Sequence, residues 1–195
     1  MKALILLATL KKDGLSNTET LCGFLAERMK KRGIDCETIK LIEHRVLSGT
    51  YLNMGRGDGW PAIAKKILAV DIVIFATPIW WGSQSSEMQR VLERLDELHD
   101  EILKGKKSRL DGKVAGIVVT GDSDGAEHVI GNLANYFNAI GLILPPYSTL
   151  TVLWDGQAKD KKTSKKQLLA KYKKEYSKTA DTMADQMVKF AGLAI

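Results

Sequence analysis

Short apolar runs alternate with amphipathic segments along the chain. The apolar runs are hydrophobic on both faces, which is typical of parallel strands covered by helices on each side. They predict strands at residues 2–8, 35–40, 71–76, 113–119 and 142–152. Hydrophobic residues spaced three and four apart predict helices at 17–32, 61–69, 85–98 and 126–140, followed by one long final helix.

This alternation predicts the fold class. It indicates an α/β domain with a doubly wound, five-stranded parallel sheet, right-handed crossovers and helices on both faces. A chain of 195 residues has the usual size of one domain, so we expect residues 1–195 to form a single domain. The polar segment from Gln157 to Lys166 is linker-like, and we interpret it as a surface insertion before the final helix.

Charge and cysteine content limit the functional classes. The net charge is +6, but lysines concentrate between Lys159 and Lys178, off the apolar stripe of the final helix. A solvated helix face explains them better than a nucleic-acid surface, because no reader motif accompanies them. Cys22 and Cys36 form neither a C-x-x-C pair nor a metal-ligand pattern. Reduced thiols and a cytoplasmic protein without a metal are therefore expected. No apolar run approaches the ~20 residues that span a bilayer, so we also expect no membrane span.

The loop after the first predicted strand is rich in hydroxyl groups and leads into a helix. A helix start offers free N–H groups and a positive dipole end, which suit a phosphate. The candidate phosphate ligands here are Thr9, Lys11, Ser16, Asn17 and Thr18. A capping box, Ser16-x-x-Glu19, is the alternative interpretation of the same residues. Neither G-x-G-x-x-G nor G-x-x-x-x-G-K-[ST] follows the strand, which favours one phosphate over a pyrophosphate.

Two further loops follow the third and fourth predicted strands. The first, Thr77 to Ser83, contains the adjacent Trp80 and Trp81, and large aromatic rings in a loop usually cover a planar ligand or lie in an interface. The second, Thr120 to His128, is a turn-forming loop, and a tight turn with an Asp cap is the alternative to a ligand contact. In a sheet ordered 2-1-3-4-5, strands one, three and four are neighbours, so the three loops are expected to meet at the switch point.

Together these motifs resemble the flavodoxin-like superfamily, specifically the NAD(P)H-dependent FMN reductase and quinone reductase type. The resemblance lies in Ser-Asn-Thr-Glu-Thr in the first loop, Thr-Pro-Ile-Trp-Trp-Gly-Ser before a helix with Leu-Glu-Arg-Leu, and Gly-x-x-x-Gly-Ala-Glu in the third loop. It extends over nearly the whole chain. The chain departs from many relatives in having Ala8-Thr9 in place of Gly-Ser and Trp80 in place of tyrosine. Residues 43–59 lack the clustered cysteines of the iron-sulfur branch.

The resemblance implies FMN as the cofactor and assigns a role to each loop. The first loop would hold the phosphate. The second would run along the ribityl chain and the flavin edge, and the third would meet the isoalloxazine ring. The implied contacts in these two loops are Thr77, Pro78, Ile79, Trp80, Trp81, Gly82 and Ser83, and then Thr120, Gly121, Asp122 and Gly125.

The resemblance also implies an activity. NAD(P)H, as NADPH or NADH, would reduce the flavin, and a small-molecule quinone or flavin acceptor would take two electrons in a ping-pong cycle. His128, near the start of a helix, is a candidate proton donor to the acceptor, and a helix-terminal polar residue without a chemical role is the alternative. A homodimer or homotetramer is implied. A non-enzymatic FMN electron carrier and a scaffold without cofactor are the competing functions, but the basic charge disfavours the carrier.

Overall fold

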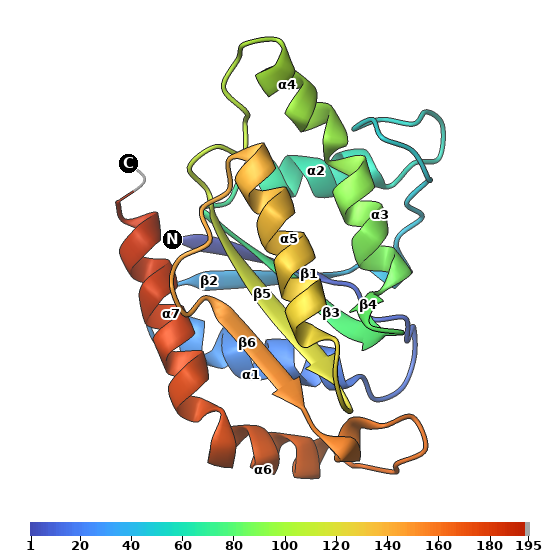
Figure 1. Ribbon diagram of the computed structural model, residues 1–195, viewed down its shortest axis with the longest axis vertical. Helices are drawn as coiled ribbons and strands as arrows, with labels where there is room; N and C mark the ends of the chain where they lie inside the picture. The colour runs from blue at the N-terminus through green and yellow to red at the C-terminus, as the bar shows by residue number, and fades with distance from the viewer. Residues whose placement is uncertain (194–195) are drawn as a thin grey trace.

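The computed structural model describes residues 1–193 and contains a parallel sheet ordered β2-β1-β3-β5-β6 (Figure 1). A short additional strand, β4, pairs antiparallel with β3. Since β5 and β6 are the fourth and fifth predicted strands, the order 2-1-3-4-5 is confirmed. The strands are β1 (Lys2–Leu7), β2 (Asp35–Lys40), β3 (Ile72–Trp80), β4 (Ser83–Gln84), β5 (Val114–Gly121) and β6 (Thr149–Leu153).

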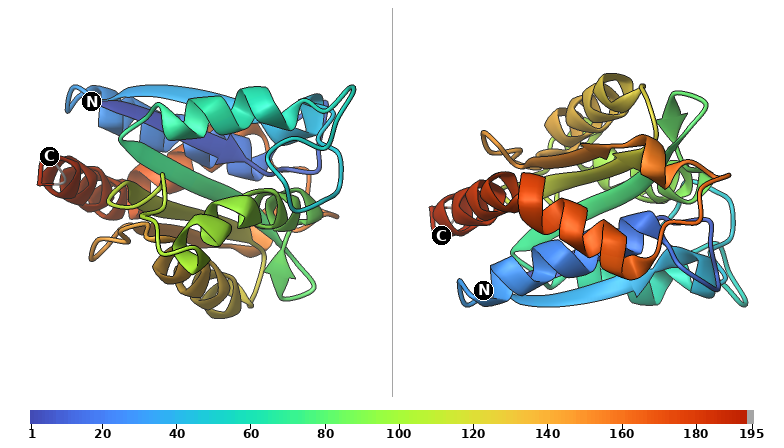
Figure 2. Two further views of the ribbon diagram at one scale, coloured as in Figure 1. Left: turned by 90° about the horizontal axis from the view of Figure 1, so that it is seen from above. Right: turned by 90° about the horizontal axis from the view of Figure 1, so that it is seen from below.

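Helices cover both faces of the sheet, as predicted (Figure 2). Along β1, Ile5 and Leu7 pack toward one face, and Leu4 and Leu6 pack toward the other, so the central strand is buried on both sides. No helix within residues 1–193 is long and apolar enough to cross a membrane. One face carries α1 (Asn17–Lys30), α6 (Lys165–Glu175) and α7 (Ser177–Ala191), and the other carries α2 (Trp60–Leu68), α3 (Ser86–Arg94) and α5 (Ala126–Ile140).

The single long final helix of the prediction is wrong, because the chain breaks there into α6 and α7. Tyr176 interrupts the helical backbone with φ −116° and ψ 3°. The hydroxyl of Ser177 donates to the carbonyl oxygen of Lys173 at 2.7 Å, a local bond that competes with the helical pattern. Both helices still bury their apolar stripes against the sheet and α1.

Three other predicted elements differ in extent. The fifth strand occupies only Thr149–Leu153, because Pro145 and Pro146 lack the N–H groups that a strand needs. The helix predicted at 85–98 ends at Arg94. A 3₁₀ turn, Asp96–Leu98, follows it and leads into α4 (His99–Leu103). The third strand runs on to Trp80, so four of the seven residues of the predicted second loop, 77–80, belong to β3.

A buried ion pair holds the connection between β2 and α2. The Arg94 guanidinium forms two hydrogen bonds with the Asp58 carboxylate, at 2.6 and 3.1 Å, and also donates to the carbonyl oxygens of Leu47 and Tyr51. Both charged side chains are fully buried. Burial alone raises the pKa of Asp58, but hydrogen bonds from Arg94 and from backbone N–H groups outweigh it and hold that pKa well below its usual range. The pair fixes this long loop onto α3.

Candidate functional site

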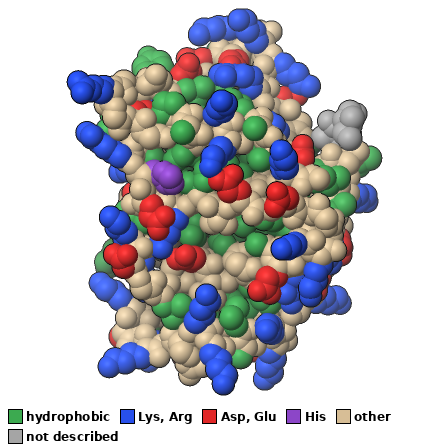
Figure 3. Space-filling view, turned by 180° about the vertical axis from the view of Figure 1, so that it is seen from behind, with side chains coloured by type: hydrophobic (Ala, Val, Ile, Leu, Met, Phe, Trp, Pro, Cys, Tyr) green, Lys and Arg blue, Asp and Glu red, His purple; other side chains and the backbone are tan. Residues whose placement is uncertain are grey.

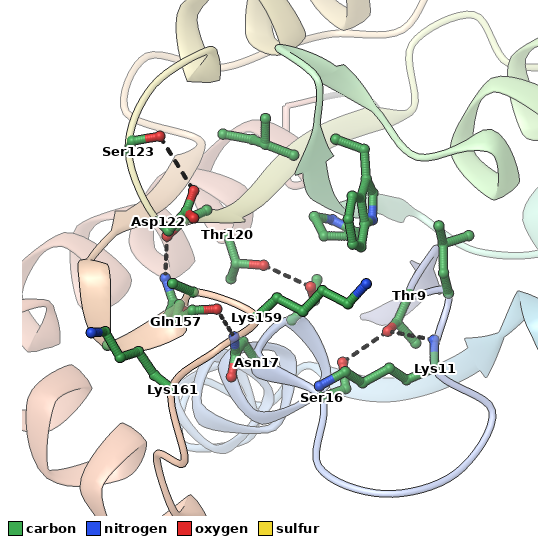
Figure 4. Close-up of a pocket in the computed structure, with 18 of the residues that line it drawn as sticks. Thr9, Lys11, Ser16, Asn17, Thr120, Asp122, Ser123, Gln157, Lys159 and Lys161 are labelled. Carbon is green, nitrogen blue, oxygen red and sulfur yellow. Dashed lines mark hydrogen bonds between the residues drawn. The ribbon is translucent and has the colours of Figure 1, made fainter.

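A cavity of about 840 Å³ lies beyond the carboxyl ends of β1, β3 and β5 (Figure 4). Its volume is in the range of small-molecule and cofactor sites, and its place is the switch point of the sheet. Four chain segments line it. They contribute Thr9, Leu10, Lys11, Leu15, Ser16, Asn17 and Thr18; residues 78–82; residues 120–124; and residues 156–159 with Lys161 and Thr163.

The start of α1 forms the first wall and presents hydrogen-bond donors. The hydroxyl of Ser16 donates to the hydroxyl oxygen of Thr9 at 3.0 Å, and that oxygen also accepts from the Lys11 N–H at 3.3 Å. The backbone N–H groups of Asn17 and Thr18 have no partner in the described part of the chain. Free N–H groups and hydroxyls at a helix start suit an anion.

Only half of the alternative capping box is formed. Ser16 accepts from the backbone N–H of Glu19 at 3.2 Å, which caps α1. The carboxylate of Glu19 does not return to the helix start but pairs with Lys40 at 3.1 Å. Capping therefore occupies the Ser16 side chain in part and leaves the first N–H groups of α1 open to a ligand.

A two-residue hairpin between β3 and β4 forms the second wall. Trp80 pairs with Ser83, and the turn consists of Trp81 and Gly82 at φ +52° and +72°. Positive φ at both central residues is the geometry of a type I′ hairpin, which suits the twist of the flanking strands. Trp80 is 42 % exposed and Trp81 is 100 % exposed, so both rings stand at the rim of the cavity.

The loop after β5 forms the third wall and touches the hairpin. Gly125, the residue before α5, has φ +90°, and a Cβ added to it would lie 2.7 Å from the Cα of Gly82. Glycine is therefore required for the two walls to meet. Asp122 and Asp124 are exposed at this end, and the Ser123 hydroxyl lies 3.3 Å from both carboxylates.

The fourth wall includes the segment predicted as a surface insertion, and residues 159–162 of it are exposed as expected, but Gln157 is not. Gln157 is only 9 % exposed and its side chain donates to the carbonyl oxygens of Gly121 and Val152, at 2.7 and 2.8 Å. Its side-chain oxygen accepts from the hydroxyl of Tyr172 at 3.0 Å, and its backbone carbonyl oxygen accepts from the side-chain amide of Asn17 at 3.0 Å. The sequence shows only a polar stretch here, so nothing in it indicated a buried glutamine.

Some predicted site residues lie outside the cavity lining. Thr77 is buried beneath the second wall, where its hydroxyl oxygen accepts from the Ser85 N–H at 3.0 Å. Ser83 belongs to β4, and Gly125 lies behind the third wall. His128 is exposed on the first turn of α5 and does not line the cavity, so its role as a proton donor stays a prediction. The remaining predicted residues surround one cavity.

Charge divides the cavity into two ends. Lys11, Lys159 and Lys161 lie with the first and fourth walls, and Asp122 and Asp124 lie with the third. The donor-rich start of α1 fits one phosphate, and the aromatic hairpin fits a planar ring beside it. Within residues 1–193, no group of three His, Cys, Asp or Glu side chains is arranged to hold a metal ion.

The fold and this cavity define a flavodoxin-like protein with a site of the kind that holds a phosphorylated planar ligand. The family model of NADPH-dependent FMN reductases matches residues 1–153, and the chain belongs to this family. The membership confirms the resemblance drawn from the sequence and the prediction of FMN as cofactor.

Two of the relatives bear on the flavin itself. The 8-demethyl-8-aminoriboflavin-5'-phosphate synthase of Streptomyces davaonensis is 33 % identical over 171 residues, which are 81 % of this chain and 65 % of the relative. The structure of RosB with a bound intermediate, 8-demethyl-8-formylriboflavin-5'-phosphate, is similar with a TM-score of 0.82 at 27 % identity. That similarity covers 99 % of this chain and 79 % of RosB.

A third relative is a much longer protein. The divalent metal cation transporter MntH of Mycobacterium bovis is 29 % identical over 163 residues, which are 81 % of this chain and 24 % of the relative. The chain therefore spans about a quarter of the length of one of these curated relatives and just under two thirds of the length of the other.

Proposed function

We propose that the protein is an FMN-dependent reductase in which NAD(P)H reduces the flavin and a quinone or a free flavin accepts two electrons by a ping-pong mechanism. The observation that carries this proposal is the meeting of a donor-rich helix start, an aromatic hairpin and the β5 loop around one cavity. Family membership supports the reaction class. We further propose that the chain is one domain and acts in the cytoplasm.

In this proposal the start of α1 binds the phosphate. The open N–H groups of Asn17 and Thr18 and the hydroxyls of Thr9 and Ser16 are neutral donors in the first wall of the cavity. The Lys11 ammonium donates to the carbonyl oxygen of Leu15 at 2.9 Å. This bond links the two ends of the loop before α1, and the ammonium adds positive charge to the first wall. A phosphate bound there fixes one end of the cofactor.

The hairpin and the β5 loop hold the rest of the cofactor. We assign the ribityl chain and the flavin edge to residues 78–82, and the ring to Thr120, Gly121 and Asp122. Thr77, Ser83 and Gly125 act by positioning these segments. FMN supplies the redox chemistry when bound, and the protein binds it, orients it and excludes water from it.

We also propose that the protein is a homodimer or a homotetramer and that the hairpin takes part in it. Trp81 projects fully into solvent from a two-residue turn, a position where a ring that covers nothing favours aggregation. A second copy that covers Trp81 would enclose the flavin edge from outside. Light scattering of the FMN-loaded protein measures the oligomeric state, and a monomer at all concentrations contradicts this part of the proposal.

The experiment that tests the activity is anaerobic reduction of the FMN-loaded protein. Addition of NADPH or NADH is expected to bleach the flavin absorbance in a single turnover, and a quinone or free FMN is expected to restore it. Steady-state rates at varied nucleotide and acceptor concentrations should give parallel double-reciprocal lines, as a ping-pong cycle requires. If neither nucleotide bleaches the flavin but a reduced protein partner does, the electron-carrier function replaces this one.

The relatives named for 8-modified riboflavin phosphates support a second candidate, in which the flavin is the substrate and leaves changed at its 8 position. Mass spectrometry of the flavin recovered after turnover separates the two functions. An unchanged FMN mass supports the reductase. A new mass that appears only with active protein supports the modifying enzyme.

A further inference from the structure

The fourth wall, within residues 156–163, lies beyond residue 153, where the family match ends. It lines the cavity between β6 and α6, and Gln157 fixes it to four other elements through the bonds described above. Burial raises the pKa of Tyr172, so its hydroxyl keeps the proton that it donates to Gln157. The base of this wall is therefore held in place.

Lys159 follows Gln157 by two residues and lines the cavity. Figure 4 shows its side chain extended across the cavity toward the side where Thr9 lies, while Lys161 points away from the cavity. Within residues 1–193, the Lys159 ammonium has no hydrogen-bond or ion-pair partner. The ammonium of Lys161, in contrast, lies 3.7 Å from the Asp160 carboxylate.

The start of α1 lacks a free cation of its own. Its donors are hydroxyls and N–H groups, and the Lys11 ammonium is bonded to the carbonyl oxygen of Leu15. A phosphate carries a charge of about −1.5 to −2 at pH 7 and binds most strongly where a positive charge joins neutral donors. Lys159 is placed to provide that charge from the opposite side of the cavity.

We propose that Lys159 is a specificity-determining residue that pairs with the FMN phosphate and makes the protein select FMN over riboflavin. This inference rests on the proposed function and adds a residue from outside the family match. Riboflavin has the same ring and ribityl chain but no phosphate, so it gains nothing from the ammonium. Because Gln157 already holds the backbone nearby, ordering Lys159 costs less entropy than ordering a free surface lysine.

The 2′-phosphate of NADPH is a second phosphate that could meet the same ammonium. We favour the FMN phosphate because Lys159 extends toward the side of the cavity where Thr9 lies, and the Thr9 hydroxyl is bonded to Ser16 at the start of α1. The test therefore measures both ligands. It compares Lys159→Gln with Lys162→Gln, which removes an equal charge from an exposed residue of the same wall that does not line the cavity.

Dissociation constants for FMN and riboflavin are measured with each apoprotein by quenching of flavin fluorescence, at low and at high salt. We expect Lys159→Gln to weaken FMN binding by about tenfold, leave riboflavin binding unchanged and reduce the salt dependence of FMN binding. Lys162→Gln should match the wild type, and Lys159→Arg should keep most of the preference for FMN. The melting temperature without flavin checks that each variant folds.

Three results overturn the inference. Equal FMN affinity in Lys159→Gln and wild type shows that the ammonium does not reach the phosphate. Equal weakening of FMN and riboflavin shows a structural role without phosphate specificity. An increased KM for NADPH at unchanged FMN affinity assigns the ammonium to the nucleotide instead. A wild type that binds no FMN at all refutes the proposed function itself, which is a different outcome from these three.

Discussion

The hydroxyl oxygens of Thr18 and Thr120 lie 2.7 Å apart and join the start of α1 to the end of β5. Both side chains are buried, and 102 positions separate them in the sequence. The bond connects the phosphate end of the cavity to the wall assigned to the flavin ring. A change at either threonine is therefore expected to affect two parts of the site together.

Replacing Thr18 with Asp should weaken FMN binding by about tenfold or more, because a carboxylate at the helix start repels a phosphate and competes for its donors. An acidic residue in the first turn is favourable for a helix, so we expect the variant to fold. Titration with FMN measures the effect, and Thr18→Ser is the matched control. Unchanged FMN affinity in Thr18→Asp would show that the phosphate does not bind at the start of α1.

Replacing Gly125 with Ala should destabilise the protein by about 1–3 kcal/mol, since the residue has a positive φ and the new Cβ would collide with Gly82. FMN binding should weaken as well, because the second and third walls move apart. Gly131→Ala, at an open helical position of α5, is the control and should stabilise by about 0.5–1 kcal/mol. Urea unfolding measures both. Similar stability in the two variants would show that the walls need no close contact.

Trp81→Asn should separate folding from function. Asn-Gly is a preferred pair for a type I′ turn, so the free energy of unfolding should stay equal or increase. Loss of the exposed ring should cost about 1 kcal/mol of contact with the flavin or with a second subunit. Unfolding curves, FMN affinity and light scattering together test this. If all three match the wild type, the tryptophan has no part in the site or the assembly.

Asp58 should make stability depend on pH under acidic conditions. Its pKa is lowered in the folded protein, so its contribution is present above the unfolded pKa of about 4 and is lost as pH falls toward the folded value. Urea unfolding between neutral and acidic pH should show this loss in the wild type. Asp58→Asn should reduce the slope in that range, and a slope equal to the wild type's would contradict the assignment to Asp58.

Arg94→Met should lower the free energy of unfolding more than Asp58→Asn does. Arg94→Met leaves a buried carboxylate without its cation, which typically costs about 3–5 kcal/mol. The loop between β2 and α2 should become accessible to proteases, because Arg94 also holds the carbonyl oxygens of Leu47 and Tyr51. Limited proteolysis locates the change. Cleavage outside this loop would show that the ion pair acts elsewhere.

The sequence predicted the sheet and most of the helices because their signals are local. Runs apolar on both faces identify buried parallel strands, and spacings of three and four identify the helices between them. The break at Tyr176 escaped prediction, since the apolar stripe continues through it and only the bond from Ser177 to Lys173 marks the change. The irregular segment before β6 was also missed, although Pro145 and Pro146 indicated it.

The site likewise combines parts that local patterns predict with a part that long-range bonds determine. The first three walls follow directly after strands, so the strand order brings them together. The fourth wall depends on Gln157, whose partners come from β5, β6, α1 and α6. No local pattern reports such a set of long-range bonds. Figure 3, the view from behind, shows Lys and Arg side chains interspersed with Asp and Glu. Basic side chains are thus spread over the surface, and the net charge alone did not indicate which lysines line the cavity.

The position of the fourth wall late in the chain has a consequence for biosynthesis. Translation proceeds from the N-terminus, so β1 to β6 are complete before Gln157 and Tyr172 have emerged from the ribosome. At that stage α1 alone covers the sheet face that α6 and α7 later share with it. Stable loading with flavin is therefore expected only after the fourth wall and α6 have emerged and docked against β5 and β6.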